Sequence, residues 1–90
     1  MYAVKFTKNA LKELQRLPKQ IRLRIVDAFE LLRINPFAEI IQFKKLRTNQ
    51  ALYRLRIGDY RVIYEVQGDV LMILVVRVGH RMDVYRYLSE

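Results

Sequence analysis

The stretch Leu52–Tyr85, LYRLRIGDYRVIYEVQGDVLMILVVRVGHRMDVY, decides the fold of this 90-residue chain. It holds two runs in which apolar and polar residues alternate, joined by Gly58-Asp59, and a third run that is almost wholly apolar. Alternation with a period of two is typical of strands with one buried face, and Gly-Asp between two such runs indicates a hairpin turn. The stretch therefore predicts three consecutive strands, at about 51–57, 60–66 and 70–78.

The first 35 residues predict a short strand and two helices. Tyr2, Val4 and Phe6 alternate with polar or small residues. Thr7 is placed to cap the helix that follows. Pro18 is placed to open a second helix, which must end before Pro36 because proline disfavours helix in the residue preceding it. The apolar stripes are Ala10, Leu11, Leu14 and Leu17 in the first helix, and Ile21, Ile25, Ala28, Phe29 and Leu32 in the second.

The predicted order is β-α-α-β-β-β, followed by a short tail. Helices that cover one face of a mainly antiparallel sheet give an α+β fold. We therefore expect residues 1–90 to form a single domain, in which an N-terminal helix hairpin packs on one face of a small sheet. The third strand of the C-terminal half is expected to pair with the N-terminal strand as well as with its hairpin neighbour.

Composition limits the kind of protein and its partners. The chain is 52% hydrophobic, carries a net charge of +8 with a pI of about 10.1, and contains no cysteine. Disulfide and thiol chemistry are therefore excluded. The charge favours nucleic acid, an anionic membrane surface or an acidic protein as partner. The longest apolar run, residues 70–76, is too short to span a bilayer, and the N-terminus lacks the apolar region of a signal peptide. The lack of cysteine is compatible with a reducing cytoplasm.

Basic side chains recur on one face of the predicted hairpin. A two-residue turn at 58–59 places Arg56 opposite Arg61, a like-charge pair that costs stability unless an anion lies between the two. The planar guanidinium fork suits phosphate oxygens. The alternative is an ordinary solvated face, on which Glu65 neutralises one arginine. The residues predicted to bind phosphate are Arg54, Arg56, Lys44, Lys45, Arg47 and Arg77.

The end of the last strand holds the only histidine. His80 follows Gly79 and precedes Arg81. Histidine can exchange protons near neutral pH, which makes His80 a candidate acid or base. The alternative is a surface histidine without a role. Tyr85 can stack on a base or pack on the sheet edge. A single histidine without cysteine does not favour zinc, and the nucleotide-binding glycine motifs are absent, so no metal or cofactor is predicted.

Several segments together resemble a known family. They are FTKNALKELQRLPKQIRLRI, NPF before KKL, LYRLRIGDYRVIYEV and RVGHRMDVY, which together cover most of the chain. The chain resembles the RelE toxins of the RelE/ParE superfamily. The resemblance implies a cytoplasmic toxin of a type II toxin–antitoxin system that cleaves mRNA in the ribosomal A site and inhibits translation. It also implies an acidic, partly disordered RelB-like antitoxin as partner, and contact with operator DNA only through the antitoxin complex.

The resemblance also implies roles for particular residues. The family's basic strand residues fall on Arg54 and Arg56, and its arginine after the turn falls on Arg61. Its arginine after Val-Gly falls on Arg81, and its downstream tyrosine falls on Tyr85. The implied catalytic set is Arg61, Arg81, His80 and Tyr85, with the 2′-hydroxyl of the RNA attacking the adjacent phosphate. Because arginine is a poor general base, the identity of the acid and the base stays open.

Two other functions are compatible with the same fold. The first is a ParE-like toxin that binds DNA gyrase and has no nuclease activity. The second is a non-catalytic basic toxin that acts as a co-repressor module with its antitoxin. Fold alone does not separate these functions from RNA cleavage.

Overall fold

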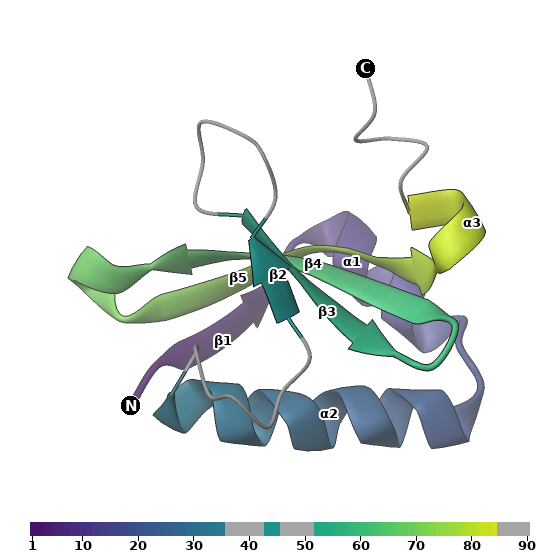
Figure 1. Cartoon of the computed structure of the whole chain (residues 1–90), viewed down its shortest axis with the longest axis horizontal. Coiled ribbons are helices and arrows are strands. Elements are labelled where there is room, and N and C mark those ends of the chain that lie inside the picture. Colours follow the sequence, from purple (N-terminus) through teal and green to yellow (C-terminus); the bar gives the residue numbers. More distant parts are fainter. Residues whose placement is uncertain (36–42, 46–51, 85–90) are drawn as a thin grey trace.

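The computed structural model describes residues 1–35, 43–45 and 52–84; for residues 43–45 it describes the main chain alone. Its elements, shown in Figure 1, are β1 (Ala3–Phe6), α1 (Lys8–Gln15), α2 (Lys19–Ile34), β2 (Phe43–Lys45), β3 (Leu52–Ile57), β4 (Tyr60–Gln67), the 3₁₀ turn η1 (Gly68–Val70), β5 (Met72–His80) and α3 (Arg81–Val84). The predicted α+β order of strand, two helices and three strands is confirmed. One more strand, β2, lies within the segment predicted to be a connector.

The strands form one five-stranded sheet in the order β1-β5-β4-β3-β2. β1 runs parallel to β5, and the other three pairings are antiparallel, so the sheet is mainly antiparallel as expected. β5 lies between β1 and β4, which confirms the double pairing predicted for the last strand. β3 and β4 pair in the register that a two-residue turn requires, with Ile57 opposite Tyr60 and Arg56 opposite Arg61.

Local signals explain where the helices begin and end. The hydroxyl of Thr7 accepts a hydrogen bond from the Ala10 amide at 3.1 Å, and so caps the free N–H groups at the start of α1. Pro18 directly precedes α2 with φ −56°, close to the value that its ring imposes. At the other end of α2, Asn35 is extended (φ −146°), as expected for a residue that precedes a proline.

The core lies between the two long helices and one face of the sheet. Phe29 of α2 meets Tyr64 edge to face with ring centroids 5.8 Å apart, and Tyr53 stacks on Tyr64 at the same centroid distance. Aromatic pairs of this kind stabilise by about 1 kcal/mol beyond the burial of their area. The buried members of this core are Ala10, Ile25, Phe29, Leu32, Leu55, Ile57, Val62, Tyr64, Ile73, Val75 and Val78. On the opposite face, Val84 of α3 packs with Leu52 and Ile63.

Tyr64 is a core residue despite its hydroxyl. Its side chain is fully buried, and among the described residues its hydroxyl has no hydrogen-bond partner. Burial, with a smaller contribution from neighbouring Tyr53, raises the pKa of Tyr64 well above its ordinary value. The phenol therefore stays neutral near physiological pH, and its role is packing.

A carboxylate from α1 secures the second half of β5. Val62 pairs with Val78, but Tyr64 pairs with Val75, so β5 carries one extra residue and bulges between them. Beyond the bulge β5 extends past the end of β1, and among the described residues no strand pairs with its edge on that side. There Glu13 accepts a hydrogen bond from the Val78 amide at 2.9 Å and pairs with Arg77 at 2.8 Å. Glu13 thus covers the exposed edge and fixes the direction in which β5 leaves the sheet.

We expect the loss of Glu13 to destabilise the fold more than an ordinary surface change does. Glu13→Ala leaves the Val78 amide and the Arg77 guanidinium without this partner, which costs about 1–3 kcal/mol of unfolding free energy. Glu13→Gln keeps a carbonyl oxygen for the amide and should lose less. Urea unfolding followed by circular dichroism measures both. The matched control is Glu30→Ala, because Glu30 forms an exposed i,i+3 pair with Arg33 and should cost under about 0.5 kcal/mol. Equal losses for Glu13→Ala and Glu30→Ala would contradict this role.

Leu71 is the one non-glycine residue with positive φ in the described part of the chain. It ends η1 at φ 50° and ψ 52°, and its carbonyl accepts the Ala3 amide that starts β1. A left-handed conformation costs a leucine about 1–2 kcal/mol. Leu71→Gly should therefore raise the free energy of unfolding by about 0.5–1 kcal/mol, because glycine adopts this conformation without strain. Val70→Gly removes a neighbouring exposed side chain without that relief and should lower stability. A loss of stability in Leu71→Gly would argue against stored strain at this position.

Candidate functional site

The turn between β3 and β4 gathers charged groups from several elements. Gly58 adopts φ +58°, a conformation that glycine reaches without the penalty paid by other residues, and Asp59 completes the two-residue turn. We call this turn, together with Arg61 and Arg81, the hairpin tip. In Figure 1 it lies at one end of the sheet, between α2 and α3.

Arg61 is built into the hairpin tip rather than displayed on the surface. Its side chain is 9% exposed, and Nη1 donates to the carbonyl oxygens of Gly58 at 2.8 Å and Tyr60 at 2.9 Å. Nε is buried and has no partner among the described residues. The strand neighbour of Arg61 is Gly79, where a Cβ would lie 3.1 Å from Val84. The absence of a side chain at Gly79 thus leaves room for α3 to pack closely beside Arg61.

Arg81 joins the tip from the end of β5. Its main-chain N–H donates to the Asp59 carbonyl at 2.8 Å, which ties the start of α3 to the turn. Its Nε lies 4.0 Å from the Asp59 carboxylate, and both side chains are more than half exposed. An ion pair this long and exposed is weak, so the guanidinium can turn to an anionic ligand at little cost. The Arg61 guanidinium from β4 and the main chain at the start of α3 are thereby bonded to one turn.

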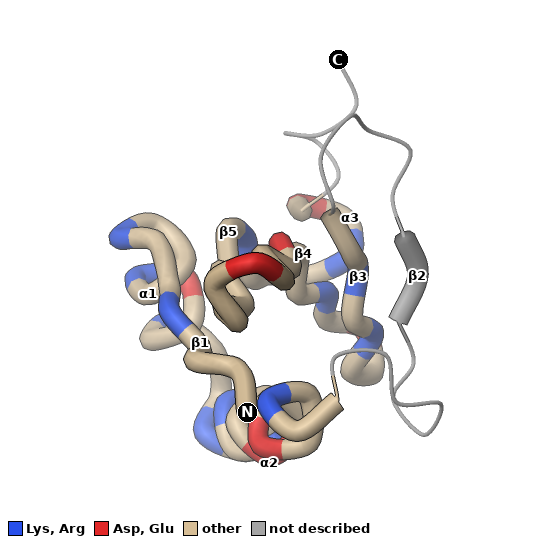
Figure 2. Tube along the Cα trace, turned by 90° about the vertical axis from the view of Figure 1, so that its left-hand side faces the viewer, with Lys and Arg blue, Asp and Glu red and all other residues tan. Residues whose placement is uncertain are grey.

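The other strand arginines extend the positive charge along β3. Arg56 is exposed and pairs in register with Arg61, and Arg54 is half-buried opposite Ile63. The predicted pairing of Arg56 and Arg61 is confirmed. The inference that this pair requires an anion is not confirmed. The Arg61 guanidinium donates hydrogen bonds to the carbonyl oxygens of Gly58 and Tyr60, and these oxygens compensate part of its positive charge. Lysines and arginines also lie on α1 and α2 (blue in Figure 2).

His80 occupies the other side of the strand end. It pairs in register with Tyr60, and their rings meet edge to face at 5.8 Å, whereas Arg61 projects from the opposite face. The Nδ1 atom of His80 accepts a hydrogen bond from the Met82 amide at 3.2 Å. In the neutral ring the proton therefore sits on Nε2, which is a donor. Proton acceptance by this ring requires the bond to Met82 to open.

The remaining predicted site residues divide into two groups. Arg77 is held by Glu13 beside the bulge in β5. The main chain of Lys44 and Lys45 lies in β2, with Lys44 in register opposite Arg54, but their side chains lie outside the described part of the chain. Arg47 and Tyr85 also lie outside the described residues.

Two residues at the tip were not predicted as site residues. Asp59 carries no motif beyond its place in the turn. Arg24 lies on α2, far from the turn in sequence, and yet its Nη1 would be 3.6 Å from a Cβ placed on Gly58. No local signal could have indicated this proximity, because it results from how α2 packs on the sheet.

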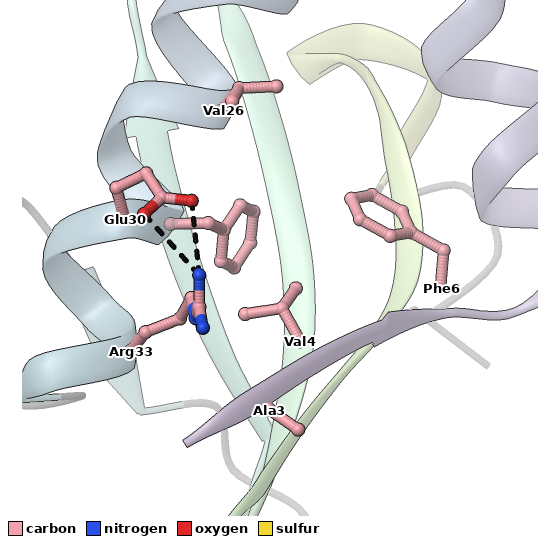
Figure 3. A pocket seen from close by; sticks show the side chains of 7 residues that line it. Ala3, Val4, Phe6, Val26, Glu30 and Arg33 are labelled. Atoms are coloured by element: carbon pink, nitrogen blue, oxygen red, sulfur yellow. Dashed lines mark hydrogen bonds and ion pairs between the residues drawn. The ribbon is translucent and has the colours of Figure 1, made fainter. Parts of the chain in front are cut away.

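A pocket of about 410 Å³ opens between β1 and α2 (Figure 3). Its walls are mainly apolar, and the ion pair of Glu30 with Arg33 lies among its lining residues. The lining residues are Ala3, Val4, Phe6, Val26, Phe29, Glu30 and Arg33. None of them belongs to the hairpin tip. Within the described part of the chain, no helix is long and apolar enough to cross a membrane.

Comparison with known proteins places this chain and its fold in a family. The family described as "ParE toxin of type II toxin-antitoxin system, parDE" matches residues 4–85. A putative RelE-like toxin from Escherichia coli is 39% identical over 99% of this chain and 95% of its own length. Toxin RelE3 from Methanocaldococcus jannaschii is 36% identical over 93% of this chain and 96% of its own.

Solved structures agree with the sequence comparison. The archaeal RelE–RelB complex from Pyrococcus horikoshii matches with a TM-score of 0.79 and 36% identity, covering 92% of this chain and 98% of the solved one. The intact E. coli RelBE toxin–antitoxin complex matches with a TM-score of 0.78 and 26% identity, covering 89% and 96%. These matches, together with the strand order and the basic hairpin, show that the chain belongs to the RelE family of the RelE/ParE toxin superfamily.

Proposed function

We propose that this protein is the toxin of a type II toxin–antitoxin system, and that it cleaves mRNA in the ribosomal A site and so inhibits translation in the cytoplasm. The family membership supports the toxin assignment. The observation that carries the nuclease assignment is the hairpin tip, where the Arg61 guanidinium and the Arg81 main chain are bonded to the same two-residue turn and the Arg81 guanidinium stays exposed beside it. Fixed positive charge beside a scissile phosphate stabilises the charge that develops in the transition state.

The proposed reaction is a transesterification within the RNA. The 2′-oxygen of one nucleotide attacks the adjacent phosphorus, and the bond from phosphorus to the 5′-oxygen breaks. The proton of the 2′-hydroxyl leaves to a base, and the 5′-oxygen takes a proton from an acid. The products are a 2′,3′-cyclic phosphate, which can open to a 3′-phosphate, and a 5′-hydroxyl end. This step needs no metal, oxidant or second substrate.

The arginines take different parts in this proposal. Arg81, which is exposed and only weakly paired, binds a phosphate oxygen directly. Arg61 is nearly buried and bonded to the turn, so it holds the turn in place. It adds its positive charge from the protein interior beneath the turn. Arg56, exposed on β3, and Arg54 beside it guide neighbouring phosphates, together with the lysines of the connector and Arg47. Arg77, held by Glu13, contributes at longer range.

His80 and Tyr85 complete the proposed catalytic set. His80 serves as general acid or base once Nδ1 is released from the Met82 amide, and until then it offers Nε2–H as a donor. Tyr85 positions or stacks on a base. Because the described residues provide no ready acid–base pair, the ribosome contributes to the chemistry, which accounts for the proposed dependence on it.

An acidic, RelB-like antitoxin is the proposed partner, and operator DNA is reached only through the antitoxin complex. Several structural relatives are complexes of RelE with RelB. The net charge of +8 and the exposed apolar side chains of Leu23, Val26 and Ile34 on α2 suit a partner of opposite charge that covers apolar surface.

We expect Arg81→Gln to slow mRNA cleavage on programmed ribosomes by about 10²–10³-fold, as when one stabilising donor is lost from an active site. Arg33→Gln is the matched control, because Arg33 is paired with Glu30 beside the β1–α2 pocket, away from the hairpin tip. This variant should cleave at the wild-type rate. Primer extension measures both rates. Unchanged cleavage by Arg81→Gln would remove Arg81 from the site.

Two substitutions of His80 separate proton transfer from positioning. His80→Ala should slow cleavage by about 10²–10⁴-fold if the ring transfers a proton. His80→Asn keeps an oxygen that can accept the Met82 amide but cannot transfer the proton, so it should be equally slow. Wild-type cleavage by His80→Asn together with slow cleavage by His80→Ala would mean that His80 only positions the chain.

The matching family is described by its ParE toxins, so gyrase inhibition is the competing function. Wild-type protein that leaves mRNA uncut on programmed ribosomes but blocks DNA supercoiling by gyrase would overturn the nuclease proposal and establish this alternative.

A further inference from the structure

The hairpin tip is approached by a third arginine, from the side opposite Arg81. Arg24 lies in the first half of α2 and is exposed. Its Nη1 lies within van der Waals range of the position that a Cβ on Gly58 would take, at 3.6 Å. Gly58 has no side chain, so nothing at that position stands between this guanidinium and the turn. Figure 1 shows how α2 runs beneath this end of the sheet.

Arg24 has no structural task within the described part of the chain. No hydrogen bond or ion pair there involves its guanidinium, in contrast to Arg33 of the same helix, which binds Glu30 and the carbonyl oxygen of Tyr2. It does not contribute to the buried stripe of α2, which is formed by Ile25, Phe29 and Leu32. The Arg24 side chain therefore lies beside the turn and takes part neither in hydrogen bonds or ion pairs of the described residues nor in core packing. It is available for a ligand.

The charge balance at the tip favours an anion as that ligand. Arg24, Arg61 and Arg81 come from α2, β4 and the start of α3, and all three lie around the same two-residue turn. Among the described residues at the tip, Asp59 supplies the one carboxylate, and it is only loosely paired with Arg81. The turn carbonyls meet part of the Arg61 charge, but the exposed charges of Arg24 and Arg81 still outnumber this one carboxylate, which favours an anionic ligand.

The geometry points to Arg24 as a phosphate-binding residue that extends the basic face of β3 around the hairpin tip onto α2. Its ligand is a phosphodiester of the single-stranded substrate RNA, next to the phosphate held by Arg81. The inference rests on the proposed RNA cleavage and adds a path for the strand. The RNA then crosses the end of the sheet instead of staying on the face that carries Arg54 and Arg56.

The test is the salt dependence of binding to a short, fluorescein-labelled single-stranded RNA with 2′-deoxy sugars that block cleavage. Each phosphate contact with a single strand contributes about 0.7 to the slope of log affinity against log salt concentration. Arg24→Gln should lower the slope by about that amount and weaken binding several-fold at low salt. Arg22→Gln is the control. It removes the same charge from the same helix about 200° away around its axis, so it should leave the slope unchanged.

Arg56→Gln separates this inference from the function on which it rests. A lower slope for Arg56→Gln with a wild-type slope for Arg24→Gln would overturn the role of Arg24 and leave the RNA-binding face intact. Wild-type protein that does not bind the RNA would overturn both. If Arg24→Gln binds the RNA normally but binds ribosomes without mRNA more weakly, the contact is to ribosomal RNA and the assignment to the substrate strand is wrong.

Discussion

The two-residue turn at Gly58 and Asp59 is the constraint on which the site depends. A left-handed glycine makes the turn tight, and the tight turn fixes the register that sets Arg56 beside Arg61. The turn is then held from both sides: Arg61 donates to the carbonyls of Gly58 and Tyr60, and the Arg81 amide donates to the carbonyl of Asp59. The Arg61 guanidinium is thereby fixed to main chain, and the main chain from which the Arg81 side chain extends is fixed as well, which is a form of preorganisation that phosphate chemistry uses.

A second constraint acts on β5, the strand that pairs with β4 and ends beside the turn. The bulge after Val75 and the Glu13 carboxylate on Val78 determine where the end of β5 arrives, and that end carries both His80 and Arg81. Consecutive residues of a strand face opposite ways, so His80 meets Tyr60 on one side of the sheet while Arg61 points to the other. A ligand that reaches both must pass around the end of the sheet, which is also where Arg24 lies.

Much of the fold could be predicted because its signals are local. The alternation around Gly58-Asp59 gave the hairpin and its register, and Thr7 and Pro18 marked the starts of the helices. The strand β2 was missed because it is three residues long. At the site, the register of Arg54, Arg56 and Arg61 could be predicted, but the orientation of a guanidinium could not. Burial of Arg61, the hold of Glu13 on Arg77 and the approach of Arg24 all depend on packing between distant segments.

The central claim is that RNA phosphate binds at the hairpin tip, and the arginine Nε–H signals in nuclear magnetic resonance spectra test it most directly. On titration with a short, uncleavable single-stranded RNA, the account predicts saturable shifts of the Nε–H signals of Arg81 and Arg56, with a smaller shift for buried Arg61. The signal of Arg33, which is engaged with Glu30 and Tyr2, should stay in place. Shifts centred on Arg33 and the β1–α2 pocket, with the tip signals unchanged, would contradict the account.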